Sequence, residues 1–183
     1  FGCRRVFCGV AGARLAAFRV TEGSGSALML RFAWLSLLVV ALDQVTKLWI
    51  LEHFALYQVV EVWPVFNLTL VFNEGAAFSF LADAGGWQQY FFIGLASVVS
   101  LVLLVWLRNM DAHERLTAWG VALVLGGAVG NLIDRLAYGK VVYFLLWHWE
   151  QYYFPSFNLA DSAITLGVIL LLIDALVSRH AEE

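Results

Sequence analysis

Long apolar stretches alternate with shorter polar ones along most of the chain. Four of these stretches are long enough for a helix to cross a bilayer, which takes about 20 residues. They run from Leu30 to Leu51, Trp87 to Leu107, Leu116 to Leu136 and Asn158 to Val177. The pattern predicts an all-α membrane protein with four transmembrane helices.

The connection between the first two spans has a different pattern. Tyr57 to Val62 and Phe66 to Phe72 alternate apolar, β-branched and aromatic residues with polar ones, as half-buried strands do. We expect these strands to form a small extracytoplasmic β-sheet on the membrane surface. Val141 to Trp149 is also apolar, but it is short and rich in aromatic residues, which favours an interfacial segment in the aromatic belt.

Basic residues indicate how the spans are oriented. Four spans place both termini on one side of the membrane, together with the short loop between Arg108 and Arg115. Arg31 and Arg179 lie on that same side. Because short loops rich in Lys and Arg stay in the cytoplasm, we expect both termini to be cytoplasmic. The longer connecting segments then face outward.

The composition strengthens the membrane interpretation. Apolar residues make up 62% of the 183 residues and the mean hydropathy is +0.79, whereas about half of a soluble domain is apolar. The length fits one domain, and the net charge of -3 gives no indication of a nucleic-acid partner. Cys3 and Cys8 lie outside the spans and provide neither metal-ligand spacing nor a disulfide framework.

Residues 1–28 differ from the rest of the chain. Scattered arginines lie among Gly, Ala and Ser there, and a sustained apolar run begins only at Met29. A signal peptide would have a short, uncharged apolar region, but this run is as long as a span and contains Asp43 and Lys47. We therefore expect residues 1–28 to be a disordered, non-native N-terminal extension and residues 29–183 to form a single four-helix domain.

Two aspartates in apolar sequence are the leading candidates for chemistry. Asp134 follows Asn131 by three residues, and Asp161 follows Asn158 with the same spacing. A carboxylate in a membrane span is costly unless it is paired or hydrated, so two of them indicate a functional site. The predicted topology brings both acids near the outer ends of adjacent antiparallel helices. The i, i+3 spacing places each amide on the same helix face as its acid.

Two carboxylates that share a partly dry site can supply a base and an acid together. They cannot both ionise cheaply, so one stays charged while the other holds its proton. The charged group could take a proton from a water that attacks a peptide carbonyl, and the protonated group could polarise that carbonyl. A structural role is the alternative, in which Asp134 pairs with Arg135 or Lys140 and Asp161 caps its helix.

Other polar residues fall near the same depth. Asp43 and Lys47 have the i, i+4 spacing of a helical ion pair, although Lys47 could instead extend to the interface. Asn73 and Gly75 lie in a stretch that suits either a backbone path beside a ligand, with Asn73 bonding a substrate carbonyl, or a simple turn. A small-residue face for helix packing is expected in the third span, at Gly126, Gly127 and Gly130.

The motifs of two other hydrolase classes are missing from the sequence. The four histidines are dispersed without a His-Glu-x-x-His pattern, which argues against a zinc protease. No Gly-x-Ser-x-Gly sequence occurs. Lys47 could serve in a Ser-Lys pair, although no serine stands out as its partner.

Four short motifs follow Met29 in a fixed order. They are Asp43-Gln44-x-x-Lys47, Asn73-x-Gly75-Ala76-Ala77-Phe78-Ser79, Gly126-Gly127-Ala128-x-Gly130-Asn131-x-x-Asp134-Arg135 and Phe157-Asn158-x-Ala160-Asp161-Ser162. Together they resemble the motifs of the lipoprotein signal peptidases, the bacterial signal peptidase II family. The resemblance implies an aspartic endopeptidase of the bacterial inner membrane that removes the signal peptide of a prolipoprotein. It would cut before a cysteine that carries a diacylglyceryl group.

The same resemblance implies roles for individual residues. It puts the catalytic pair on Asp134 and Asp161. Support of this pair or contact with the substrate falls on Asn73, Gly75, Asn131, Arg135, Asn158, Ala160, Asp43 and Lys47. The implied partner is a lipidated prolipoprotein held in a phospholipid membrane and reached near the periplasmic face. No metal or organic cofactor is implied, and we expect a monomer.

One position departs from the family pattern. The family typically has Val-Val-Asp-Phe where this chain has Val141-Val142-Tyr143-Phe144. The change removes an acid near the pair, so the neutral tyrosine should let the charged aspartate ionise more readily. Two alternatives to an active peptidase stay open. One is a small membrane carrier that uses the aspartates as proton relays, and the other is an inactive homologue.

Overall fold

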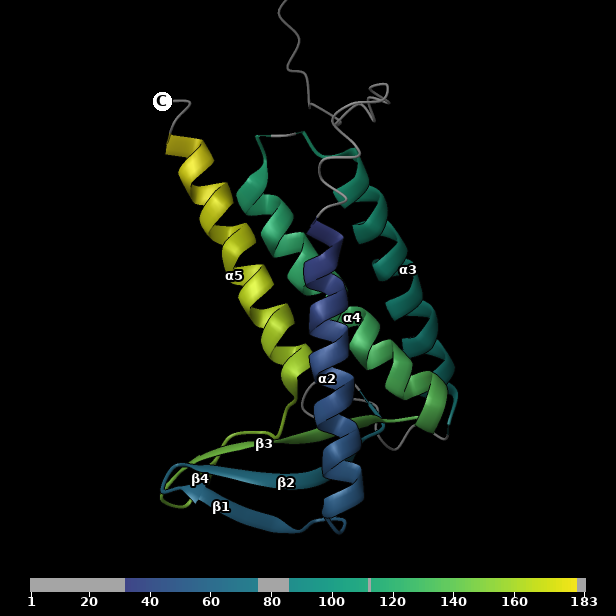
Figure 1. The fold of residues 1–183 in the computed structure, drawn as a ribbon, viewed down its shortest axis with the longest axis vertical. Helices are drawn as coiled ribbons and strands as arrows, with labels where there is room; N and C mark the ends of the chain where they lie inside the picture. The colour runs from purple at the N-terminus through teal and green to yellow at the C-terminus, as the bar shows by residue number, and fades with distance from the viewer. Residues whose placement is uncertain (1–31, 76–85, 112, 181–183) are drawn as a thin grey trace, which may run out of the picture.

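Long helices run the length of the molecule in the computed structural model, which describes residues 32–75, 86–111 and 113–180 (Figure 1). They are α2 (Ala33–His53), α3 (Trp87–Asn109), α4 (Arg115–Tyr138) and α5 (Leu159–His180). Each is long and apolar enough to span a bilayer. The four predicted spans are confirmed, with ends that shift by a few residues. The predictions for residues 1–28 and 76–79 fall outside the described part.

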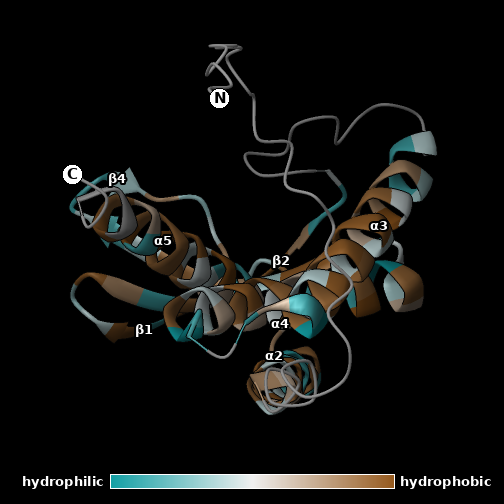
Figure 2. Cartoon of the chain, turned by 90° about the horizontal axis from the view of Figure 1, so that it is seen from above, coloured by the Kyte–Doolittle hydropathy of each residue, from teal (hydrophilic) through white to brown (hydrophobic). Residues whose placement is uncertain are grey.

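Helix α4 is the centre of the bundle and packs against α2, α3 and α5 (Figure 2). Its side chains Val121 and Ala122 are fully buried in an apolar cluster with residues of α2 and α3. The outer faces of α3 and α5 instead expose large apolar side chains, such as Leu101 and Leu172. A continuous apolar surface of this kind fits contact with lipid rather than with water.

The close packing of α4 depends on glycines. A Cβ atom at Gly126 would lie 2.8 Å from the Cβ of Val39 in α2. A Cβ atom at Gly127 would meet the backbone oxygen of Ala160 in α5. The small-residue face predicted for the third span is confirmed as a packing surface, because no larger side chain fits between these helices.

Replacing Gly127 by alanine should push α4 and α5 apart and lower the stability of the folded protein. Gly94 in α3 is a matched control, because a Cβ atom there would meet nothing within 4 Å. Gly94→Ala should be neutral or stabilising, since alanine is favoured over glycine in helices by about 1 kcal/mol. Thermal unfolding of the purified protein in detergent measures both effects. Equal unfolding midpoints for the two variants would contradict this packing argument.

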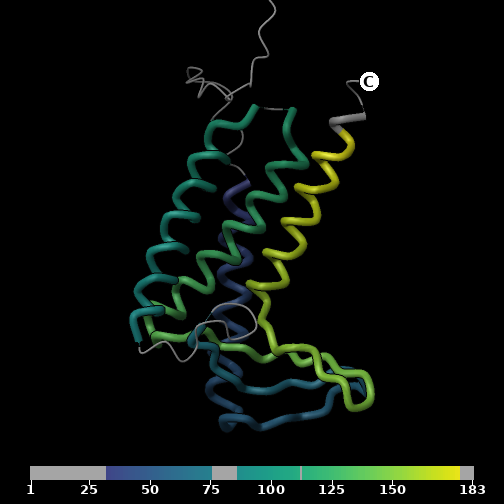
Figure 3. The backbone as a smooth tube through the Cα atoms, turned by 180° about the vertical axis from the view of Figure 1, so that it is seen from behind, coloured from purple at the N-terminus to yellow at the C-terminus, as the bar shows by residue number. Residues whose placement is uncertain are grey.

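An antiparallel sheet lies at the end of the bundle opposite the C terminus (Figure 1, Figure 3). Its strands are β1 (Val59–Trp63), β2 (Phe66–Asn73), β3 (Val141–Trp149) and β4 (Tyr152–Tyr153), in that order across the sheet. The first two strands lie where the alternating pattern predicted them. The predicted small sheet is therefore confirmed, although it is larger than expected.

Val141 to Trp149, for which the sequence predicted an interfacial aromatic segment but no strand, forms strand β3 of this sheet. Tyr143 pairs with Val71 in the ladder between β2 and β3. Val142 and Phe144 are buried in a second apolar cluster together with residues of α2. The pairing was missed because its partner strand lies far earlier in the chain, and no local turn signal marks such a connection.

Short connections bring several element ends to one place. Helix α4 ends at Tyr138 and is capped by Gly139, which has a left-handed φ of 72° and whose N–H donates to the Arg135 carbonyl at 3.0 Å. Strand β3 follows at once, and α5 begins directly after Asn158. The end of α4, the start of β3 and the start of α5 therefore meet beside α2.

Candidate active site

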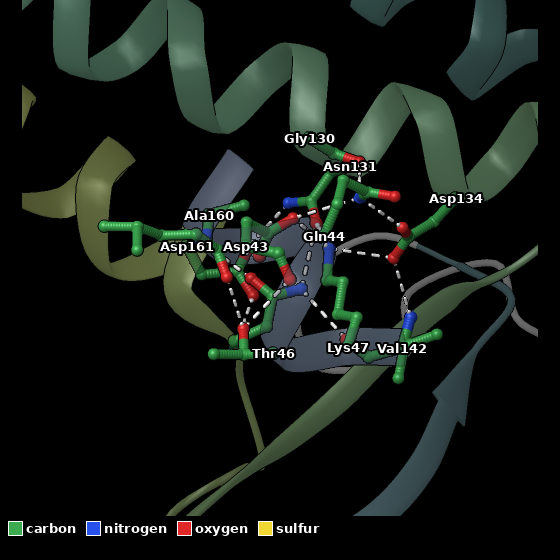
Figure 4. A network of polar contacts seen from close by, with 12 residues as sticks. Asp43, Gln44, Thr46, Lys47, Gly130, Asn131, Asp134, Val142, Ala160 and Asp161 are labelled. Atoms are coloured by element: carbon green, nitrogen blue, oxygen red, sulfur yellow. Dashed lines mark hydrogen bonds and ion pairs between the residues drawn. The ribbon is translucent and has the colours of Figure 1, made fainter. Parts of the chain in front are cut away.

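Lys47 of α2 is the centre of a buried polar network (Figure 4). Its Nζ atom lies 2.7 Å from Asp43 Oδ2, 2.8 Å from Asp134 Oδ2 and 3.1 Å from Asn131 Oδ1. These contacts use all three donors of the ammonium group. The side chain is 2% exposed. The predicted ion pair with Asp43 is therefore confirmed, and the extension of Lys47 to the interface is contradicted.

Asp134 is enclosed by this network. Its side chain is 0% exposed, and both of its oxygens accept hydrogen bonds. Gln44 Nε2 donates to Oδ1 at 2.9 Å, and the Val142 N–H donates to Oδ2 at 3.0 Å beside Lys47. The bond from Val142 ties the end of α4 to the start of β3. Asp134 thus holds three elements together.

Asn131 connects Lys47 to the second aspartate. Its Oδ1 atom accepts hydrogen bonds from Lys47 Nζ and, at 2.9 Å, from Asn158 Nδ2. Its Nδ2 group donates to Asp161 Oδ1 at 2.8 Å. The structure therefore brings both aspartate–asparagine pairs into one network, in which Asn131 and Lys47 lie between Asp161 and Asp134.

Helix α5 begins with a reciprocal cap. Asn158 Oδ1 accepts the Asp161 N–H at 2.8 Å, and Asp161 Oδ2 accepts the Asn158 N–H at 3.3 Å. The Ala160 N–H donates to Asp43 Oδ1 at 2.9 Å, which satisfies another free donor of the first turn. Asp161 therefore helps to cap its helix, as the structural alternative predicted. A cap also fixes the direction of the carboxylate, so it is compatible with a chemical role.

The end of β2 forms the neighbouring wall together with Arg135. Asn73 Nδ2 donates to Tyr143 Oη at 2.8 Å, and Asn73 Oδ1 accepts the Gly75 N–H at 2.9 Å. Arg135 donates to the Gly75 carbonyl at 3.3 Å and lies 5.4 Å from the centre of the Phe92 ring, rather than pairing with its neighbouring aspartate. Arg135 therefore holds the backbone after β2 against α3 and α4.

A cavity of about 620 Å³ lies between α5 and the chain segment that precedes it. Asp161 and Tyr143 line it, together with mainly apolar side chains. Two of these, Phe154 and Leu166, are 57% and 56% exposed. The cavity therefore opens on the side of α5 that would contact lipid. Asp134 is not among the described residues that line it.

Tyr143 is held neutral by its surroundings at this cavity. Burial raises the pKa of its hydroxyl above the ordinary value of 10.0, and the negative charge of Asp161 raises the pKa further. The hydrogen bond from Asn73 and the charge of Arg135 act in the opposite direction. The net shift is upward, so Tyr143 carries its proton throughout the physiological pH range.

The network has two members that sequence reasoning did not assign. Gln44 and the Val142 N–H both bond Asp134. Gln44 could have been found, because it is a polar side chain directly after Asp43 in the first predicted span. The contribution of Val142 depends on strand β3, which was not predicted. Tyr143 was noted as a departure from a family pattern that would ease ionisation of the charged aspartate, and not as a hydrogen-bond donor.

The arrangement suits proton transfer at one carboxylate. Asp161 is half-buried, is oriented by Asn131 and Asn158, and faces a cavity that could hold a peptide. Such a group can take a proton from a water molecule placed against a carbonyl carbon. Within the described ranges, no three His, Cys, Asp or Glu side chains gather as the ligands of a metal ion would.

Known proteins resemble this chain along most of its length. Residues 35–177 match the family described as Signal peptidase (SPase) II. The lipoprotein signal peptidase of Pseudomonas putida is 51% identical over 156 residues, which cover 84% of this chain and 91% of the relative. That of Pasteurella multocida is 49% identical over 154 residues, which cover 84% of this chain and 93% of the relative.

A solved structure has the same fold. It is a bacterial membrane enzyme determined by the in meso method at 2.3 Å resolution, and it is 34% identical with a TM-score of 0.75. The match covers 84% of this chain and 92% of the other. Four helices in the described part are long and apolar enough to span a membrane, and the relatives are bacterial, so the chain is a multi-pass bacterial membrane protein. The relatives give no support to a carrier. Sequence, fold and relatives agree that the chain belongs to the signal peptidase II family.

Proposed function

We propose that this chain removes the signal peptide from diacylglyceryl-modified prolipoproteins by cutting before the lipidated cysteine. The named relatives are lipoprotein signal peptidases at 51% and 49% identity. The proposed enzyme acts as a monomer in the bacterial inner membrane, with both termini in the cytoplasm and its site near the periplasmic face. The distribution of flanking arginines supports this orientation.

The observation that carries the proposal is the position of Asp161. Its carboxylate lines an apolar cavity at the sheet end of a transmembrane bundle, and the cavity opens on a lipid-facing side of α5. A cysteine that carries two acyl chains stays in the bilayer, because each buried CH₂ contributes about 0.8 kcal/mol. The bond to be cut must therefore reach the site sideways from the membrane. A laterally open cavity suits that route.

Asp161 is the group we assign to activating water, as in an aspartic endopeptidase. Asn131 donates to one oxygen and the Asn158 N–H to the other, so the carboxylate is held in one orientation. A fixed base beside the substrate carbonyl contributes about 10²- to 10⁴-fold to the rate of hydrolysis. The surrounding apolar wall limits the access of bulk water and strengthens these electrostatic contacts.

Asp134 is better suited to positioning than to touching the substrate. The sequence-based hypothesis made it the second member of the catalytic pair, yet its oxygens are occupied by Lys47, Gln44 and the Val142 N–H. Freeing it would break a buried ion pair, which costs about 3–5 kcal/mol. We propose that Asp134 holds Lys47, that Lys47 holds Asn131, and that Asn131 orients Asp161.

The substrate requirement gives a direct test. Purified protein in lipid vesicles should cut a precursor peptide whose cysteine carries a diacylglyceryl group and should leave the same peptide without that group intact. Mass spectrometry of the products should locate the cut directly before the modified cysteine. Equal cutting of both peptides would contradict the proposed dependence on lipid. Failure to cut either one, with folded protein, would reject the function.

A further inference from the structure

One carboxylate faces the cavity, whereas hydrolysis of a peptide bond by acid and base catalysis commonly uses two side chains. Among its described lining residues, Asp161 is the acidic side chain, because Asp134 is enclosed in the network behind it. An enzyme that cleaves a peptide bond must also stabilise the negative charge that develops on the carbonyl oxygen. A hydrogen-bond donor should therefore face the cavity near Asp161.

Tyr143 has the geometry of such a donor. Its side chain lines the cavity together with Asp161, on strand β3. Asn73 Nδ2 donates to Tyr143 Oη at 2.8 Å, so the amide occupies a lone pair of the hydroxyl and leaves the hydroxyl proton available. A second bond from Asn73 Oδ1 to the Gly75 N–H fixes the orientation of the amide. The phenol is thus held by a neighbour that cannot take its proton.

We infer that Tyr143 is the second catalytic residue of this chain, and that its hydroxyl donates a hydrogen bond to the scissile carbonyl oxygen while Asp161 activates the water. This inference rests on the proposed function. It assigns to a tyrosine the role that a second carboxyl group would otherwise fill. The neutral state of Tyr143 favours the role, because only the protonated phenol can donate.

The proposed reaction needs no net proton transfer from Tyr143. The Asp161 carboxylate takes one proton from water while the water oxygen bonds to the carbonyl carbon, and the π electron pair moves to the carbonyl oxygen. Tyr143 stabilises that oxygen through its hydrogen bond. The electron pair then re-forms the carbonyl, the C–N bond breaks, and Asp161 returns its proton to the leaving nitrogen. The products are a carboxyl group on the signal peptide and the amino group of the cysteine.

Tyr143→Phe is the first test, because it removes the hydroxyl and keeps the ring. We expect kcat on the lipidated peptide to fall by about 10²- to 10³-fold, as for the loss of one oxyanion donor. KM and the thermal unfolding midpoint should change little. Tyr152→Phe is the matched control, since Tyr152 lies on β4 with 71% of its surface exposed and should keep full activity. A Tyr143→Phe variant as active as the parent would overturn the inference.

Tyr143→Asp provides the second test through the pH profile. The groups that act on this position are Asp161 of α5 and Arg135 and Asp134 of α4. The raised pKa of Tyr143 keeps the donor protonated from about pH 6 to 9, so the parent should show no loss of rate at the basic end. A carboxyl at position 143 donates only while protonated. The Tyr143→Asp variant should therefore remain active near pH 6 and lose rate as the pH rises.

Comparison of the parent with both variants separates failure of the inference about Tyr143 from failure of the proposed function. An inactive folded parent would reject the proposed function and the inference with it, and an active Tyr143→Asp variant beside it would show that the phenol cannot serve. An active parent matched by an equally active Tyr143→Phe variant would overturn the inference alone. A parent profile that falls with rising pH like that of Tyr143→Asp would overturn it as well. Failure of the folded parent and of both variants to cut the lipidated peptide would reject the proposed function, and the inference with it.

Discussion

Replacing Asp161 by asparagine should abolish cleavage of a lipidated precursor peptide while leaving the protein folded. Asparagine keeps the size of the side chain and one acceptor oxygen, so the cap at the start of α5 loses at most part of its bonding. It cannot take a proton from water. The expected loss is about 10²- to 10⁴-fold in kcat, which single-turnover cleavage in lipid vesicles would measure.

Asp134→Asn is the informative comparison for this variant. Asp134 is buried in an ion pair with Lys47, so its replacement should lower the unfolding midpoint as well as the rate. Asp161→Asn should lower the rate with little change in stability. If Asp134→Asn left stability unchanged and abolished activity, Asp134 would have the chemical role that the sequence-based hypothesis gave it. If Asp161→Asn kept a tenth of the parent activity, Asp161 would not be the base.

The largest effect on stability is expected from Lys47→Met. Methionine fills a similar volume but carries no charge. The carboxylates of Asp43 and Asp134 therefore lose the cation that they share. Breaking a buried ion pair in this way costs about 3–5 kcal/mol, because the remaining charge stays buried. Unfolding of the purified protein by a denaturing detergent, followed through tryptophan fluorescence, would measure the loss.

Lys140→Met is the matched control for Lys47→Met. The ammonium group of Lys140 lies 4.0 Å from the centre of the Phe72 ring and forms no ion pair with the described residues. Lys140 is half-buried, and a cation–π contact contributes about 0.5–2 kcal/mol, depending on how far it is desolvated. Adding Asp134→Asn to Lys47→Met should recover part of the lost stability, since it removes one of two uncompensated charges. No recovery would show that lost packing, rather than charge, causes the effect.

Local patterns were sufficient to predict the helices and the spacing of the polar residues. The four spans were visible because a bilayer demands long apolar runs, and their polar exceptions stood out against that background. The i, i+4 spacing of Asp43 and Lys47 predicted their contact correctly, since a helix fixes the distance between such positions. The glycines of α4 were likewise interpretable as a packing face.

The contacts between distant segments could not be predicted in the same way. Asp134 had two basic neighbours in the sequence, and nothing local favoured Lys47 over them. Lys47 became the partner because α2 packs against α4 at that height. The position of Tyr143 beside Asp161 depends on the pairing of β3 with β2, which is a property of the assembled sheet.

The cap that Asp43 provides for α5 has a consequence for biosynthesis. Asp43 Oδ1 accepts the Ala160 N–H, so the first described helix supplies an acceptor to the start of the last one, 117 residues later. Asp161, which Asn131 orients, also belongs to that last helix. A nascent chain that has inserted only α2, α3 and α4 therefore carries Lys47 with Asp43 and Asp134 but lacks Asp161, the proposed base. Proteolytic activity can therefore begin only after α5 has been synthesised and has packed against α2 and α4.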